Sequence, residues 1–188
     1  GEASGDQSGC SVSLSSDGYM LAIGAYGNNG NTGHVRIYNF NGSSWNQLGQ
    51  DIDGEASGDQ SGCSVSLSSD GNMLAIGAYG NSGNGSSSGH VRVYNWSGTS
   101  WNQLGQDIDG EAIDDYSGYF VSLSSDGSRV AIGAGYNDGN GSNSGHVRIY
   151  SYNGTSWNQL GDDIDGEAFG DVSGISISLS SDGNILAI

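Results

Sequence analysis

Short apolar runs separated by Gly-, Ser- and Asn-rich segments recur along the whole chain, and one unit shows the pattern. At 63–68 apolar residues alternate with serines, the period-two pattern of a strand with one apolar face. Residues 69–72 read Ser-Asp-Gly-Asn, a hairpin signal. The nearly continuous apolar run at 73–78 is typical of a strand buried on both faces. Two further strands are expected at 90–96 and 101–108, and no segment has the apolar spacing of a capped helix.

The whole unit is repeated with few changes. Related phrases begin at Gly1, Gly54, Gly110 and Gly166, so the period is 53 or 56 residues. The difference in length falls in one polar loop, as a surface loop tolerates. Four short strands in a unit of this length are typical of a β-propeller blade. We predict an all-β fold of tandem four-stranded antiparallel blades, forming a β-propeller or a propeller-like open array.

The repeats divide the chain into blades at 1–53, 54–109 and 110–165, with a partial blade at 166–188. Closed propellers need about four to eight blades. Three and a half blades cannot close a ring. We therefore expect a fragment of a longer array, several copies that combine, or an open stack.

The charge balance excludes some classes of partner. The sequence has 21 Asp and Glu against 4 Arg and no Lys, giving a net charge of −17. Such a surface repels phosphate backbones and anionic membranes, so nucleic-acid binding is not expected. No run approaches the roughly 18 apolar residues of a membrane span, so membrane insertion is not expected either.

The phrase SGCSVSLSSDGNMLAIGAYG at 61–80 resembles the FG-GAP repeat, the blade unit of integrin α-chain-type propellers. Ser61-Gly62 stands where that family has Phe-Gly, and Gly77-Ala78-Tyr79 where it has Gly-Ala-Pro. The resemblance implies a propeller fold, an extracellular location, adhesion and calcium in an Asp-rich first hairpin. This chain looks like a short-hairpin variant without that calcium loop, because residues 69–72 carry one carboxylate.

A second acidic segment joins successive repeats and offers another possible calcium site. It reads D-x-D-G-E with a further Asp four residues on, and hard oxygen ligands at such spacing can hold calcium. The alternative is a turn whose carboxylates accept backbone N–H groups. The candidate metal ligands are Asp53, Glu55, Asp59, Asp109, Glu111, Asp115, Asp165, Glu167 and Asp171. No other cofactor is expected.

Five N-x-[ST] sequons are candidate glycosylation sites in or beside predicted loops. The alternative is chance, because the loops are rich in Asn, Gly and Ser. The candidate residues are Asn41, Asn84, Asn95, Asn140 and Asn153.

Features copied into every blade favour structural roles, since a catalytic centre is an asymmetric set of residues. The histidines are expected to make structural hydrogen bonds, the arginines to pair with carboxylates, and the tryptophans to pack between blades. A row of exposed Trp stacking on sugars is the alternative. Cys10 and Cys63 share a slot with Tyr119 and Ile175, which predicts buried free thiols over a bridge between repeats. The repeated residues are His34, His90, His146, Arg36, Arg92, Arg148, Trp45, Trp101 and Trp157.

These patterns predict a non-catalytic extracellular or cell-surface scaffold, part of a surface or fibrous assembly. The alternative is an adhesion or lectin-like propeller that recognises sugar or protein through its loops, with or without calcium. An enzyme is not expected. The expected partners are further blades or other copies of the chain, because unpaired blade faces promote self-association. Glycans and surface proteins are the expected partners under the alternative.

Overall fold

Each complete repeat forms one antiparallel sheet in the structure, a computed structural model that describes residues 1–188. In the first sheet β1 (Ser11–Leu14) pairs with β2 (Met20–Ala25), and β2 pairs with β3 (His34–Phe40). The outer edge of β3 pairs with two short strands, β4 (Trp45–Gln47) and β5 (Ile52–Asp53). This is the predicted tandem arrangement of antiparallel blades.

The second and third sheets repeat the same topology, and the last segment contributes one hairpin. The second sheet contains β6 (Ser64–Leu67), β7 (Met73–Ala78), β8 (His90–Trp96), β9 (Trp101–Gln103) and β10 (Ile108–Asp109). The third contains β11 (Phe120–Leu123), β12 (Arg129–Ala134), β13 (His146–Tyr152), β14 (Trp157–Gln159) and β15 (Ile164–Asp165). The final hairpin is β16 (Ser178–Leu179) with β17 (Leu186–Ala187). One helical turn, α1 (Asn28–Asn31), lies in the shorter loop of the first repeat.

The fourth strand of each blade differs from its prediction. The sequence predicts one strand at 101–108, whereas the structure has β9 and β10 separated by a bend. Gly105 lies in this bend with φ +71°, a left-handed conformation that interrupts the extended backbone. The Leu104 N–H still reaches the Val93 carbonyl at 2.8 Å, so the outer edge of β8 stays covered along most of its length.

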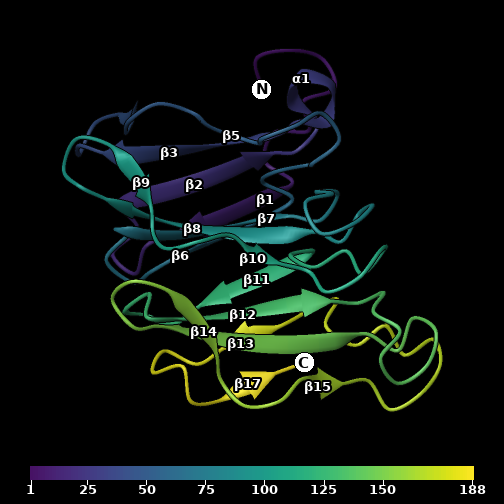
Figure 1. Cartoon of the computed structure of the whole chain (residues 1–188). Coiled ribbons are helices and arrows are strands. Elements are labelled where there is room, and N and C mark those ends of the chain that lie inside the picture. Colours follow the sequence, from purple (N-terminus) through teal and green to yellow (C-terminus); the bar gives the residue numbers. More distant parts are fainter.

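The blades stack face to face along the chain, from the N-terminal blade to the C-terminal hairpin (Figure 1). The stack is open, since the sheets do not close into a ring. The innermost strands are joined by an unusual ladder. Ser11 and Ser13 accept hydrogen bonds from the backbone N–H groups of Val65 and Leu67, both at 2.9 Å. The polar face of each inner strand thus binds the next blade, while its apolar face packs on the previous one.

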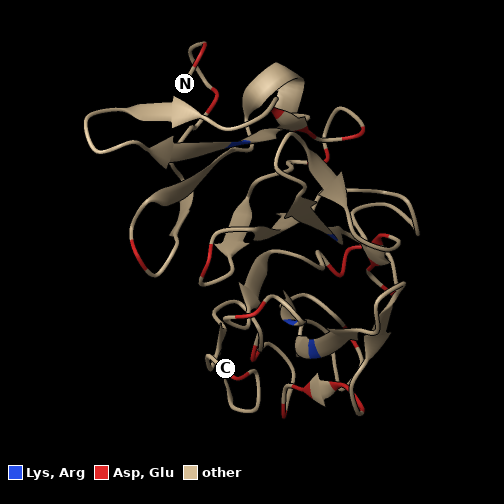
Figure 2. Cartoon of the chain, turned by 90° about the vertical axis from the view of Figure 1, so that its left-hand side faces the viewer, with Lys and Arg blue, Asp and Glu red and all other residues tan.

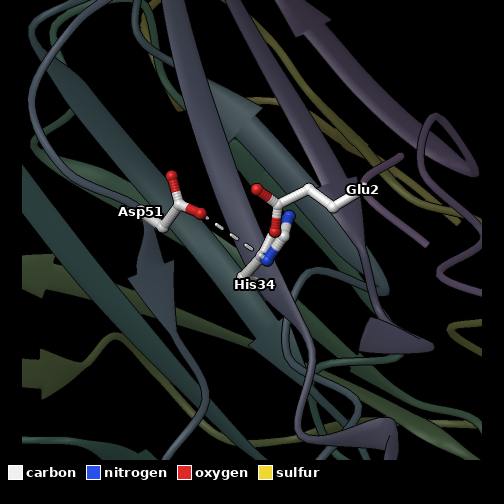
Figure 3. A group of neighbouring side chains, drawn as sticks. All are labelled: Glu2, His34 and Asp51. Atoms are coloured by element: carbon white, nitrogen blue, oxygen red, sulfur yellow. Dashed lines mark ion pairs between the residues drawn. The ribbon is translucent and has the colours of Figure 1, made fainter. Parts of the chain in front are cut away.

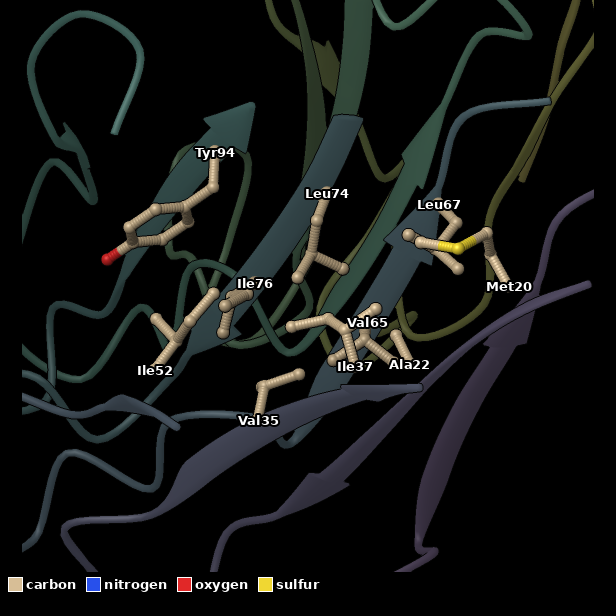
Figure 4. Close-up of a cluster of buried hydrophobic side chains, with 10 residues drawn as sticks. All are labelled: Met20, Ala22, Val35, Ile37, Ile52, Val65, Leu67, Leu74, Ile76 and Tyr94. Carbon is tan, nitrogen blue, oxygen red and sulfur yellow. The ribbon is translucent and has the colours of Figure 1, made fainter. Parts of the chain in front are cut away.

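Hydrophobic cores lie between neighbouring blades (Figure 4). The first core combines residues of β2, β3 and β5 with residues of β6, β7 and β8. Its members are Met20, Ala22, Val35, Ile37, Ile52, Val65, Leu67, Leu74, Ile76 and Tyr94. A second core of nine buried residues repeats this arrangement between the second and third blades. Each blade therefore buries its faces only through its neighbours.

Charges and thiols complete the description of the fold. Acidic residues are spread over the loops, and the few arginines lie among the strands (Figure 2).

Both cysteines are free, but only Cys63 has a partly buried side chain, and Cys10 is exposed. Burial raises the pKa of the Cys63 thiol to about 12, so this thiol stays protonated at neutral pH. No helix of the structure is long and apolar enough to cross a membrane.

Candidate functional site

A cluster of one histidine, one arginine and two carboxylates recurs in every complete blade. In the first blade Glu2, His34 and Asp51 bring their ligand atoms within 4.8 Å of one another (Figure 3). His34 begins β3, and Asp51 lies just before β5, which pairs with β3 at His34. The equivalent clusters are Glu55, His90 and Asp107, and then Glu111, His146 and Asp163. Because three potential metal ligands meet in each copy, this repeated cluster is the candidate functional site considered first.

An arginine neutralises part of the acidic charge in each cluster. Arg36 Nε lies 3.0 Å from Asp51 Oδ1, and its NH2 group lies 2.9 Å from Asp51 Oδ2 and also contacts Glu2. The hydrogen bonds from Arg36 hold the pKa of Asp51 below its usual range, and Arg148 does the same for Asp163. The predicted pairing of the arginines with carboxylates is confirmed.

Arg92 uses its guanidinium differently from the other two. Its NH2 group donates to the Asp53 carbonyl of the preceding blade at 2.8 Å, and its NH1 group lies 3.6 Å from Glu55. The guanidinium also lies 5.7 Å from the centre of the Tyr94 ring, within the range of a cation–π contact. Arg92 therefore ties the second blade to the first as well as balancing charge.

The histidines are buried and lie close to the carboxylates without a short hydrogen bond. His90 Nδ1 is 3.8 Å from Asp107 Oδ2, and His146 Nδ1 is 3.7 Å from Asp163 Oδ2. Burial lowers the pKa of His90, and Arg92 lowers it further, while Asp107 and Glu55 act against this. Burial also lowers the pKa of His146, whose Nδ1 has no hydrogen-bond partner. The neutral imidazole is thus the favoured form in the folded chain.

The cluster is a structural network in which an arginine offsets part of the carboxylate charge. A divalent cation binding to Asp51 and Glu2 would have to displace the guanidinium of Arg36, which already contacts both carboxylates. Metal binding here would separate charges that the fold has paired, and a buried unpaired Arg is costly. The same reasoning applies to the third cluster, where Arg148 contacts both Glu111 and Asp163.

The residues of the predicted calcium segment are distributed between two roles. Asp59 Oδ2 accepts the backbone N–H groups of Glu55 and Ala56 at 3.0 and 2.9 Å, as a turn-capping carboxylate does. The Glu55 side chain joins His90 and Asp107, apart from Asp53 and Asp59. Capping of the same kind is made by Asp115 and Asp171, whereas Glu111 joins His146. Calcium binding by Asp53, Asp109, Asp165, Glu167 and the others stays a prediction.

The sequons differ in how accessible their asparagines are. Asn41 and Asn153 are exposed at hairpin turns, where their Oδ1 atoms accept backbone N–H groups two and three residues on. The Nδ2 atoms of Asn84 and Asn140, to which a glycan would be attached, donate to the carbonyls of Gly110 and Gly166. Asn95 lies near the end of β8, inside the strand expected at 90–96, and is half-buried. The geometry favours Asn41 and Asn153, and occupancy at every site stays a prediction.

The repeated tryptophan of the second and third blades packs against the preceding blade. Trp101 Nε1 donates to the Leu48 carbonyl at 3.1 Å, and Trp157 Nε1 donates to the Leu104 carbonyl at 2.9 Å. Trp157 is 3% exposed, whereas Trp45 has no preceding blade here and is 43% exposed. The packing role is confirmed for Trp101 and Trp157, and an exposed row of sugar-stacking tryptophans does not form.

Sequence reasoning missed the clustering of Glu, His and Asp, although a signal for it exists. The glutamate opens each repeat, the histidine opens the third strand, and the aspartate precedes the strand that pairs there. Each residue recurs with the repeat period, so the set shares one environment. Its members are far apart along the chain, and only the pairing of β5 with β3 shows that they meet.

Comparison with known proteins gives one family match and several similar folds. Residues 52–94 match the model of the FG-GAP repeat. No curated protein sequence matches the chain. The structure is similar to a candidate 6-phosphogluconolactonase from Bacteroides uniformis, with a TM-score of 0.63 at 11% identity, covering 94% of this chain and 45% of that one.

Two other similar structures share the same kind of fold. TolB from Acinetobacter baumannii has a TM-score of 0.51 at 16% identity, covering 94% of this chain and 36% of that chain. Sqt1 from Saccharomyces cerevisiae has a TM-score of 0.53 at 15% identity, covering 84% of this chain and 36% of that chain. The chain therefore spans less than half the length of the structures it resembles. At these identities the likeness shows the fold alone, which is that of β-propeller-like proteins. The chain is accordingly a tandem array of propeller-type β-blades in which residues 52–94 match the FG-GAP repeat.

Proposed function

We propose that this chain is a non-catalytic scaffold of repeated β-blades that serves in an extracellular surface or fibrous assembly. The observation that carries the proposal is the repetition of its polar clusters. Each Glu-His-Asp set is copied from blade to blade, and its arginine engages the carboxylates in two of the three copies. One polar set copied into every blade favours a structural role, because a catalytic centre is an asymmetric set of residues.

The extracellular part of the proposal has two supports. The resemblance to FG-GAP repeats favours an extracellular location, since that family is associated with adhesion. The second support is that Asn41 and Asn153, each in an N-x-[ST] sequon, are exposed at hairpin turns, where a glycan can be carried. Mass spectrometry of the protein from a glycosylating host, before and after enzymatic deglycosylation, measures their occupancy. A loss of mass at Asn41 and Asn153 supports the proposed location, and unmodified peptides at both speak against it.

Lactone hydrolysis is the competing function that the comparison suggests and the one to test directly. A phosphorylated sugar lactone would meet a molecule of net charge −17 that has no Lys. All four arginines contact acidic, carbonyl or amide oxygens. We expect no hydrolysis of 6-phosphogluconolactone above the spontaneous rate. Activity that disappears in a His90→Ala variant of unchanged fold would overturn the scaffold proposal.

Electron microscopy of the purified native material tests the assembly itself. Fibres or sheets with a repeat set by the blade spacing would support the scaffold. Isolated discs with a central channel would contradict it and favour a ligand-binding propeller.

A further inference from the structure

The third repeat differs from the second at several positions, and four of these changes replace a non-aromatic residue with an aromatic one. In an array of near-copies, shared residues maintain the common fold. Residues that break the repeat and also meet in space are candidates for a specific function. Four non-aromatic positions of the second repeat, Gln60, Cys63, Ser64 and Gly80, become Tyr116, Tyr119, Phe120 and Tyr136. Tyr79 becomes Gly135, so the tyrosine of that loop moves by one residue.

Three of these new rings combine with Tyr79 of the second blade into an aromatic pocket. Its walls are Tyr79, Tyr116, Tyr119 and Tyr136, and its volume is about 270 Å³. The centre of the Tyr79 ring lies 5.0 Å from the centre of the Tyr119 ring and 5.8 Å from that of Tyr116. The ring centres of Tyr116 and Tyr136 are 5.1 Å apart. Tyr119 and Tyr136 are each more than a third exposed, so the pocket opens to solvent.

The aromatic rings replace a structural hydrogen bond of the repeat. Ser11 and Ser64 each accept a backbone N–H from the next inner strand, at 2.9 and 3.0 Å. Phe120 stands at the same position, has no hydroxyl, and stacks against Tyr119 with ring centres 5.4 Å apart. The third blade thus lacks an acceptor that the other two blades use, and it gains an aromatic contact beside the pocket.

Two new carboxylates lie close in sequence to the pocket tyrosines, again through changes found in the third repeat. Gly58 and Ser82 of the second repeat become Asp114, two residues before Tyr116, and Asp138, two residues after Tyr136. Both aspartates are exposed. Two other new charges lie elsewhere in the repeat: Asp162 replaces Gln106, and Arg129 begins β12, whereas Tyr136 follows the other end of that strand, roughly 20 Å away. Asp114 and Asp138 are called the acidic rim below, because each lies two residues along the chain from a pocket tyrosine; the Asp138 carboxylate also accepts the Asn143 N–H at 2.8 Å.

The geometry points to a binding site for a small quaternary ammonium cation in the pocket of Tyr79, Tyr116, Tyr119 and Tyr136. The faces of aromatic rings attract a cation that sheds little hydration, and several rings around one opening are the usual way in which proteins hold a trimethylammonium group. The carboxylates at the rim raise the local concentration of cations and disfavour anions. Neutral sugars and apolar ligands would gain nothing from this rim.

Isothermal titration with choline tests the site, and two further probes separate the contributions. The neutral isostere 3,3-dimethyl-1-butanol has the same shape without the charge, and phosphocholine adds the phosphate that a lipid headgroup carries. We expect saturable choline binding, with the isostere at least about tenfold weaker. Phosphocholine should also bind more weakly than choline, because its phosphate meets the acidic rim. Equal binding of the isostere, or no saturable binding of choline, would overturn the proposal.

Variants taken from the protein's own repeats keep the fold as a control. Tyr116→Gln with Tyr119→Ile places the residues of the second and fourth repeats into the pocket, and should weaken choline binding at least about tenfold. Asp114→Gly with Asp138→Ser restores the second-repeat rim and should weaken it severalfold. Tyr152→Trp is a matched change to the second-repeat residue outside the pocket and should leave binding unchanged. If the tyrosine variant unfolds at the same urea concentration as the parent and still binds choline equally well, the assignment is wrong.

Discussion

Pairs of glycines set the distance between blades at the scale of single residues. A Cβ atom added to Gly77 would lie 1.9 Å from the Gly118 carbonyl oxygen, and one added to Gly24 would lie 2.0 Å from that of Gly62. Real Cβ atoms do not approach backbone so closely, so the two blades would have to move apart. Residue 77 has no positive φ, and its requirement for glycine is therefore one of space between blades.

We predict that Gly77→Ala lowers the free energy of unfolding by about 3 kcal/mol. The new Cβ would clash with the Gly118 carbonyl, and a backbone group cannot avoid the clash by a change of rotamer. Gly83→Ala is the control. Its added Cβ would meet only side-chain oxygen atoms, those of the Asn81 carboxamide and the Asp109 carboxylate. It should change stability by about 0.5 kcal/mol or less. Urea unfolding followed by tryptophan fluorescence measures both. Equal effects of the two variants would show that the close approach is not what requires Gly77.

The buried histidines predict a loss of stability in mild acid. The pKa of His90 and of His146 is lowered in the folded chain, chiefly by burial. The unfolded chain therefore binds more protons as the pH falls through about 6.5, and the free energy of unfolding decreases below that pH. The lowered pKa of Asp51 and Asp163 adds a second loss, in stronger acid, as pH falls below about 4.

Urea unfolding between about pH 7.5 and pH 5 isolates the histidine contribution, because the aspartates stay ionised there. His90→Gln with His146→Gln should flatten the decline in stability over this range. A decline of unchanged slope in the double variant would assign the acid sensitivity to other groups.

At the scale of elements, the inner strands have two faces with different chemistry. Val65 and Leu67 face the preceding blade and are buried, while Ser64 and Ser66 face the following blade and accept its backbone N–H groups at 3.0 Å. These bonds satisfy strand N–H groups at the blade junction, where an unpaired donor would be costly. One four-residue strand thus carries both the apolar and the polar part of two successive junctions.

We predict that Ser66→Ala destabilises the protein by about 1–3 kcal/mol, because it leaves the Leu123 N–H without its acceptor. Hydrogen exchange at the Leu123 amide should speed up in the variant. Ser86→Ala serves as control, since Ser86 is exposed and its hydroxyl makes no hydrogen bond. Unchanged exchange at Leu123 would mean that water or a shifted backbone group replaces the serine.

At the scale of the whole molecule, the outer face of the first blade is a copy of a surface that elsewhere is covered. Val12 and Leu14 are both 57% exposed, whereas their counterparts Val65 and Leu67 are 6% and 8% exposed beneath the first blade. An exposed apolar sheet face of this kind promotes association with another blade. We therefore expect copies of this 188-residue chain to associate through this face.

We predict that sedimentation velocity shows association that increases with protein concentration and is reduced by Leu14→Glu. Ser43→Glu adds the same charge at an exposed hairpin turn and should leave the association unchanged. A concentration-independent monomer, or equal effects of the two substitutions, would contradict association through the first blade.

The sequence determined the all-β class, the blade repeat and most strand positions, because strand pairing follows the local alternation of apolar and polar residues. It also separated copied residues from unique ones. Its limits appear at the fourth strand, where Gly105 breaks the predicted element through a left-handed dihedral. They appear again at Glu55, which turns to His90 instead of joining Asp53 and Asp59.

Only the tertiary structure decided which distant residues share an environment. Gln60, Cys63 and Gly80 of the second repeat are replaced by tyrosines at three separated positions, and nothing local shows that these rings meet around Tyr79. The meeting depends on how one blade is rotated against the next, which the cores and glycine contacts fix together. Local patterning thus determined the strands, whereas the pairing of strands within a blade determined the charge clusters and packing between blades determined the pocket.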